Sequence, residues 1–216
     1  MNEAIQPGRP SRRPGRPGPR RFSADSERTR SAILRAAAAL AAQDGLEGLS
    51  IAGVAAAVGI PKSGLHAYFG SKTDLQLAVV AEAARTFAAE VVQPALAAPA
   101  GLGQLTAVCE AFFAHLERGT FPGGSFMTGM ALEMGTRPGP VNELIREHQS
   151  AFGGLLQGFA VTALAQGELP GSEDPARLAF ELNGIIAATD TNFVQHDDPA
   201  VLTLARQIIR QRLTDA

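Results

Sequence analysis

The sequence predicts an all-α protein, and three observations support that prediction. Along most of the chain, apolar residues recur about every three or four positions, which places them on one face of a helix. Clusters of glycine and proline, such as FPGG at 121–124 and RPGP at 137–140, divide the chain into segments. No apolar run alternates with polar residues between turn signals, as the strands of a sheet would.

Residues 50–59 predict a short helix that ends in a sharp turn. Ser50 can cap this helix because its hydroxyl can accept a hydrogen bond from the first backbone amides. Gly59 suits the left-handed conformation that ends a helix, and Pro61 suits the start of the next one, where its missing N–H costs nothing. The apolar positions of the first helix are Ile51, Val54, Ala55 and Val58.

The segment after Pro61 predicts a second helix with one buried face and one outward face. Leu65 and Phe69 can point into the core. The outward face then carries Lys62, Ser63, His66 and Tyr68. Two helices joined at such a corner are typical of proteins that place the second helix in the major groove of DNA. The same pattern also suits an ordinary helical hairpin, which needs a glycine turn and an apolar anchor.

Ser71 predicts the start of a third helix, which we expect to run to about Val92 and to end before Pro94. Lys72 lies in its first turn, where the helix dipole disfavours a cation. A contact with a DNA phosphate would explain this lysine, and a solvated surface position is the alternative. Further helices are expected at about 103–118, 125–134, 141–167, 175–194 and 199–213.

Residues 28–80 open with the helical pattern RTRSAILRAAAALAAQDG and close with SKTDLQLAVV, and they resemble the N-terminal domain of the TetR family of transcriptional regulators. The resemblance implies a three-helix DNA-binding domain, assigned to residues 23–70. It also implies a larger helical domain, assigned to residues 71–216, that binds a ligand and dimerises. By position, it implies DNA contacts from Ser50, Lys62, Ser63, Gly64, His66, Tyr68 and Lys72.

The sequence departs from the family pattern at three of these positions. His66 stands where tyrosine is usual, Gly64 where threonine is common, and Pro61 where serine is common. The residues left to read bases are mainly Lys62, Ser63 and Tyr68.

Residues 1–22 are rich in arginine, proline and glycine, and we expect them to be disordered because they have little apolar surface to bury. The run Gly15-Arg16-Pro17 partly resembles the core of an AT-hook, which lies in the minor groove. Arg16 is therefore a candidate DNA contact. The alternative is a generic basic tail that raises nonspecific affinity.

Composition restricts the class of protein further. Cys109 is the only cysteine, so the chain has no internal disulfide framework and suits a reducing cytoplasm. No apolar run is long enough to span a membrane, and the N-terminus lacks the apolar core of a signal peptide. Residues 1–75 carry 11 Lys and Arg against 6 Asp and Glu, and residues 76–216 carry 8 against 15. A basic front and an acidic remainder fit a domain that contacts phosphates and a body that does not.

The larger domain contains soft and aromatic side chains that could line a ligand cavity between helices. The segment GGSFMTGMALEMGTRPGPVNELI resembles a ligand domain found in part of the TetR family, with Ser125 where related chains often carry cysteine. Candidate ligand residues are Phe112, Phe113, His115, Phe126, Met127, Met130, Met134, Phe152 and Asn192. The alternative for each is an ordinary core position, or a satisfied polar group for the histidine and the asparagine.

The last two expected helices carry more apolar surface than one buried face needs. The resemblance implies that they pair with a second copy across a twofold axis, which would set two DNA-binding domains against a palindromic site. Candidate dimerisation residues are Leu178, Leu182, Ile185, Ile186, Val201, Leu204 and Ile208. Burial within the monomer competes for the same residues.

The sequence gives little support to an enzyme. The four histidines are scattered without the spacing of metal ligands, and Cys109 lacks the signature of a reactive thiol, so we expect no metal, cofactor or catalytic residue. We predict a repressor that binds double-stranded DNA as a homodimer and is released by a small apolar or amphipathic effector. The alternatives are a helical ligand-binding protein that acts on a protein partner, and a protein that coats DNA without sequence preference.

Overall fold

The computed structural model describes residues 24–214, and within this range the chain forms helices and loops without a strand, as predicted. The helices are α1 (Ala24–Gly48), α2 (Ile51–Val58), α3 (Lys62–Tyr68), α4 (Lys72–Phe87), the π-helical segment η1 (Ala88–Val92), α5 (Gln93–Leu96), α6 (Leu102–Glu117), α7 (Phe126–Met134), α8 (Pro140–Ala165), α9 (Pro175–His196) and α10 (Ala200–Thr214). None of these helices is both long and apolar enough to cross a lipid bilayer. The predicted arm at residues 1–22, with Arg16, lies outside the described range.

The predicted corner between α2 and α3 is confirmed. The Ser50 hydroxyl accepts a hydrogen bond from the amide of Gly53 at 3.0 Å and so caps α2. Gly59 has φ 70° and ψ 28°, a left-handed conformation that glycine adopts without steric penalty. Ser71 caps α4 in the same way, through the amide of Asp74 at 3.0 Å. These local features fix where α2 begins and ends and where α4 begins.

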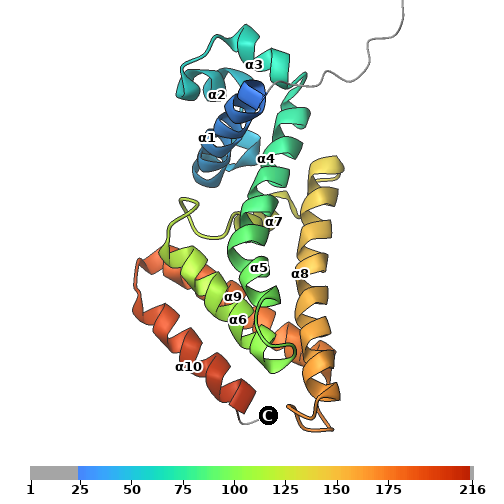
Figure 1. The fold of residues 1–216 in the computed structure, drawn as a ribbon. Coiled ribbons are helices and arrows are strands. Elements are labelled where there is room, and N and C mark those ends of the chain that lie inside the picture. Colours follow the sequence, from blue (N-terminus) through green and yellow to red (C-terminus); the bar gives the residue numbers. More distant parts are fainter. Residues whose placement is uncertain (1–23, 215–216) are drawn as a thin grey trace, which may run out of the picture.

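The helices α1, α2 and α3, which we call the head, lie together at one end of the molecule, and α4 runs from them toward the other end (Figure 1). One apolar cluster joins the head to α4, α7 and the start of α8. A second cluster lies among α6, the later part of α8, α9 and α10, which belong to the body that follows α4. Leu75 and Val79 of α4 lie in the first cluster, so α4 completes the core of the head although the proposed domain division falls before it.

The helix that begins at α4 does not end before Pro94, as the sequence predicts, but continues through η1 and α5 to Leu96. In η1 the amide of Gln93 donates to the carbonyl of Ala88, five residues earlier, so this turn is wider than a regular α-helical turn. In a regular helix the ring of Pro94 would collide with the carbonyl four residues earlier. The wider turn relieves that collision, and the helix continues past the proline.

Candidate nucleic-acid interface and effector cavity

The helix α3 presents a polar face to solvent at the end of the head. Leu65 is fully buried and Phe69 is 2% exposed, so these two side chains hold α3 in the first apolar cluster. Lys62, Ser63 and His66 are exposed. Their side chains make no hydrogen bond or ion pair with another residue of the range 24–214. They can therefore contact DNA without first breaking an intramolecular bond.

The other predicted DNA contacts lie beside this face. Gly64 and Tyr68 are half-buried, and the Tyr68 ring lies 6.3 Å from the ring of Phe69 between centroids. Ser50 is exposed, and its hydroxyl oxygen accepts the capping bond of α2. A hydroxyl that accepts one hydrogen bond can still donate its own proton, so Ser50 can cap α2 and bond to a phosphate together.

Lys72 is 43% exposed at its side chain, and it is bonded within the protein. Its Nζ donates to the backbone carbonyl of Glu47 at 2.6 Å and lies 3.4 Å from the carboxylate of the same residue. Glu47 lies in the last turn of α1, where carbonyl groups without helical partners attract a cation. This bond explains a lysine in the first turn of α4 without a phosphate, and the phosphate contact remains a prediction.

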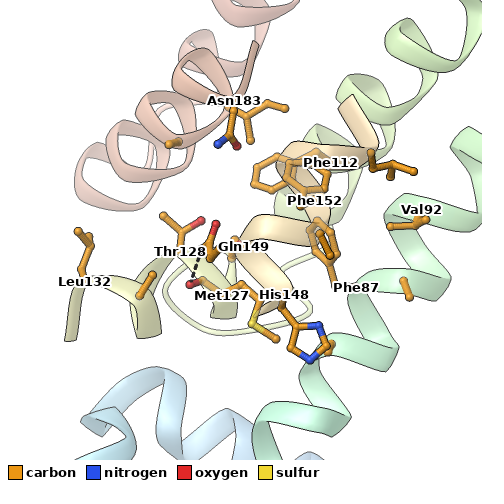
Figure 2. A pocket seen from close by; sticks show the side chains of 18 residues that line it. Phe87, Val92, Phe112, Met127, Thr128, Leu132, His148, Gln149, Phe152 and Asn183 are labelled. Atoms are coloured by element: carbon orange, nitrogen blue, oxygen red, sulfur yellow. Dashed lines mark hydrogen bonds between the residues drawn. The ribbon is translucent and has the colours of Figure 1, made fainter. Parts of the chain in front are cut away.

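A cavity of about 430 Å³ lies between α4, η1, α6, α7, α8 and α9 (Figure 2). Its volume is within the range of small-molecule sites in proteins. Phe87, Phe112 and Phe152 form one wall, and each comes from a different helix. Leu132, which is 78% exposed, lies at the rim, so the cavity is open to solvent beside α7. A small molecule can therefore enter the body of the protein.

Of the predicted ligand residues, Phe112, Met127 and Phe152 line this cavity. The remaining predictions are wrong for this cavity. The buried residues that do not line it are Phe113, His115, Phe126, Met130 and Met134. Asn192 is exposed on α9, where its amide donates to the carbonyl of Ala188 at 2.8 Å. These predictions failed because apolar spacing identifies buried positions and does not distinguish a packed core from the wall of a cavity.

The buried His115 bonds to Glu90 of η1 instead of facing the cavity. Its Nδ1 lies 2.7 Å from Oε2 of Glu90, which also accepts hydrogen bonds from Arg118 and Thr120. Burial raises the pKa of Glu90, but the hydrogen bonds from His115, Thr120 and Arg118 outweigh it, so the net effect lowers the pKa. His115 is therefore a satisfied structural histidine, which was the alternative to a ligand contact.

Other cavity residues are absent from the predictions. His148, Phe152 and Leu155 share one face of α8 at helical spacing, and the aromatic pattern predicts only Phe152. The same spacing would have selected the other two. Thr128 of α7 and Asn183 of α9 also line the cavity. Both are polar residues within apolar helices, and this pattern in a sequence is only weak evidence for a cavity.

The helix α7 connects the cavity to the head through Glu133 near its C-terminus. The Glu133 carboxylate accepts hydrogen bonds from the amides of Leu46 and Glu47, each at 2.9 Å. Both amides lack helical partners because α1 is broken at Gly45, which has φ 80° and ψ 159°. A Cβ atom at residue 45 would lie 2.9 Å from the carboxylate, so glycine suits both the backbone angle and the close approach.

The other end of α7 is bonded to α9. Asp190 accepts a hydrogen bond from the amide of Ser125 at 2.9 Å. Asp190 is 3% exposed, and this burial raises its pKa although the Ser125 amide and the nearby Thr128 hydroxyl act to lower it. Between these ends, Met127, Thr128 and Leu132 line the cavity. The nine-residue helix α7 and its N-cap residue Ser125 thus contact α9, the cavity and the head.

Comparison with protein families identifies both parts of the chain. Residues 33–79 match the family described as bacterial regulatory proteins, tetR family. Residues 101–209, just over half of the chain, match the tetracyclin repressor-like C-terminal domain. This chain belongs to the TetR family of transcriptional regulators. TetR-family regulators bind DNA and are not enzymes, which agrees with the exposed face of α3.

Solved structures share the fold of this TetR-family regulator. A TetR transcriptional regulator from Chloroflexus aurantiacus is 24% identical, with a TM-score of 0.77 over 87% of this chain and 95% of that chain. A TetR-family regulator from Agrobacterium tumefaciens is 22% identical, with a TM-score of 0.75 over 85% and 97%. AibR, in complex with isovaleryl coenzyme A and operator DNA, is 23% identical, with a TM-score of 0.66 over 83% and 96%. No curated protein sequence matches the chain.

The predicted dimerisation residues of this TetR-family regulator fall into two groups. Leu178, Leu182 and Ile186 are at most 2% exposed and pack in the second apolar cluster of their own chain. Their assignment to an interface is therefore wrong, because burial in the monomer leaves them no surface for a partner. The candidates that keep accessible surface are Ile185, Val201, Leu204 and Ile208. Phe180 of α9, which is 79% exposed, was not predicted and also belongs to the accessible apolar surface of this helix pair.

Proposed function

We propose that this TetR-family regulator is a cytoplasmic repressor that binds a palindromic operator as a homodimer and is released when a small apolar or amphipathic effector occupies the cavity. The observation that carries the proposal is the position of α7. This helix lines the cavity through Met127 and Thr128 and bonds to the head through Glu133. A ligand that displaces α7 would therefore act directly on the helix that supports the DNA-binding corner.

In this proposal, α3 enters the major groove. Lys62, Ser63 and Tyr68 would contact bases, because they lie on the outward side of a helix whose other side is anchored by Leu65. The proposed contacts to the DNA backbone are Ser50, Gly64, His66 and Lys72. AibR, which has the same fold, is described in complex with operator DNA and isovaleryl coenzyme A, which supports one fold that holds DNA and a small molecule.

The homodimer would form through the accessible faces of α9 and α10. Leu204 and Ile208 lie one helical turn apart on α10 and are 56% and 43% exposed. Large apolar side chains that remain exposed in a monomer are typical of a surface that is covered in an assembly. We expect Ile208→Glu to convert a dimer into a monomer in sedimentation-velocity experiments. The matched control is Val161→Glu, at a position of α8 that is 50% exposed and lies outside the proposed face.

Release requires that the effector bind the released conformation more tightly than the DNA-bound one. A nearly complete switch needs a difference of about 5.5 kcal/mol, and a partial switch needs less. The contacts of α7 provide a physical basis for that difference in affinity. A ligand in the cavity would change the packing of α7, and Glu133 of α7 bonds to the amides that follow the break in α1. The head spacing of the dimer would then no longer match successive turns of the DNA groove.

The experiment that tests the proposal is the capture of genomic DNA fragments by the full-length protein at two salt concentrations, followed by sequencing of the retained fragments. A palindromic consensus that persists at the higher salt supports the regulator. Uniform retention that disappears at the higher salt would instead identify a DNA-coating protein. No retention at either salt would favour the ligand-binding protein that acts on a protein partner.

A variant separates base reading from general attraction to DNA. We expect Lys62→Ala to weaken binding to the consensus fragment by about 1–3 kcal/mol and to leave binding to random DNA nearly unchanged. Arg146→Ala is the control, because Arg146 is an exposed cation of α8 outside the head. Equal losses for the two variants would remove Lys62 from the base-reading set.

A further inference from the structure

We propose that the effector is an uncharged aromatic compound that carries one hydroxyl, carbonyl or amide group, which bonds to Asn183. This inference rests on the proposed function of the cavity as the effector site. It adds the chemical class of the ligand, which is argued from the charge, the shape and the hydrogen-bonding groups of the cavity wall (Figure 2).

Within the described part of the chain, the wall of the cavity has one ionisable side chain, His148, and none with a permanent charge. Among the described residues that line it, none is lysine, arginine, aspartate or glutamate. The buried Asp190 does not line the cavity, and its carboxylate already accepts a hydrogen bond from the Ser125 amide. A charged ligand would lose its hydration without gaining a fixed counter-charge, which is strongly unfavourable in an apolar site. An uncharged ligand avoids that cost.

The aromatic wall suits a ring rather than a flexible chain. The Phe87 ring meets the Phe112 ring at a centroid distance of 6.0 Å and an angle of 70°. It meets the Phe152 ring at 5.3 Å and 82°. Both are edge-to-face arrangements, in which the electron-poor edge of one ring meets the electron-rich face of another. A ligand ring beside Phe112 and Phe152 would extend the same packing into the cavity.

The hydrogen-bonding group is assigned to Asn183 because its amide is available. Asn183 projects from α9 into the cavity, across from the aromatic residues (Figure 2). Its side chain makes no hydrogen bond with another described residue. Gln149, by contrast, donates to the carbonyl of Met127 at 3.0 Å. An amide offers both donors and an acceptor, so Asn183 can bond to a hydroxyl, a carbonyl or an amide of the ligand.

The test uses three probes of one shape: biphenyl-4-carboxamide, biphenyl-4-carboxylate and biphenyl. Their binding to the full-length protein is measured by isothermal titration calorimetry in the absence of DNA. We expect the carboxamide to bind about tenfold or more tightly than the carboxylate, because only the carboxylate must be desolvated as an ion. We also expect it to bind about fivefold more tightly than biphenyl, the value of one net hydrogen bond.

Two variants locate the hydrogen bond. Asn183→Leu should make the affinities of carboxamide and biphenyl equal while retaining the binding of biphenyl. Asn192→Leu changes the same residue type on the same helix, at an exposed position outside the cavity, and should leave both affinities unchanged. Circular dichroism of both variants checks that the helices are intact, so a loss of binding through misfolding is recognised.

Each result decides between named outcomes. Tighter binding of the carboxylate would overturn the assignment of an uncharged ligand, and no binding of carboxamide and biphenyl would overturn the aromatic class. A carboxamide advantage that survives Asn183→Leu would overturn the assigned contact. Probe binding that fails to release the operator fragment would contradict the proposed repressor mechanism and leave the ligand class standing.

Discussion

The carboxylate of Glu133 bonds α7, a helix that lines the cavity, to the head, and its removal should measurably lower the stability of the protein. In Glu133→Ala, the amides of Leu46 and Glu47 lose their acceptor. The break at Gly45 leaves these amides without a helical carbonyl to replace it. The variant therefore removes the hydrogen bonds without removing a large apolar side chain from either cluster.

The expected loss of stability follows from the two hydrogen bonds. A hydrogen bond to a charged acceptor contributes about 1.5–3 kcal/mol when it is buried. One of these bonds is exposed and the other partly buried, so we take about 1 kcal/mol for each and about 2 kcal/mol together. For a chain of this size, that loss lowers the Tm by about 4–8 °C.

The assay combines calorimetric unfolding with amide hydrogen exchange measured by NMR. About 1 kcal/mol for each bond corresponds to exchange about fivefold faster at the two amides. Glu147→Ala is the matched control, since Glu147 is an exposed glutamate of α8 whose side chain makes no hydrogen bond or ion pair within residues 24–214. If Glu133→Ala unfolded at the temperature of this control, with unchanged exchange at Leu46 and Glu47, the link through α7 would be refuted.

Three further predictions address single residues. Lys72→Ala should weaken binding to all DNA and reduce the slope of log affinity against log salt concentration by about one, as measured by fluorescence anisotropy. An unchanged slope would remove Lys72 from the phosphate contacts. Burial raises the pKa of the Cys109 thiol to about 12, so iodoacetamide at about pH 8 should label Cys109 only after denaturation, as mass spectrometry would show. Burial also raises the pKa of Asp190, so the folded protein retains this proton to higher pH than the unfolded chain. The stability of the native protein relative to Asp190→Asn should therefore fall from about pH 4 upward in urea unfolding, and a difference that grows with pH would contradict the shift.

The corner of the head could be predicted from sequence because its determinants are local. Ser50 and Ser71 each accept a hydrogen bond from an amide three residues later, and Gly59 needs only its own backbone angles. Such features depend on a few neighbouring residues, so they can be predicted from the sequence. The rule for Pro94 is equally local, and it failed because the π-helical turn of η1 relieved the collision on which the rule depends.

The cavity could not be predicted in the same way, because it depends on how distant helices pack. Phe112 and Phe113 are adjacent in sequence and both nearly fully buried, but only Phe112 lines the cavity. Likewise, the bond from Leu46 to Glu133 joins residues 87 positions apart and exists only once α7 has packed against α1. No spacing rule within one helix contains that information.

The π-helical turn in η1 has a consequence for the geometry of the assembled regulator. Deleting one residue of this turn, so that it becomes regular α-helix, would rotate α4 by about 100° relative to α5, since each residue advances a helix by that angle, and would disturb the apolar cluster that joins the head to α7 and α8. In the proposed dimer, the direction of each α3, and hence the separation of half-sites that the pair could span, would depend on this turn. An insertion or deletion here would then change the proposed operator spacing and leave the residues proposed to contact DNA unchanged.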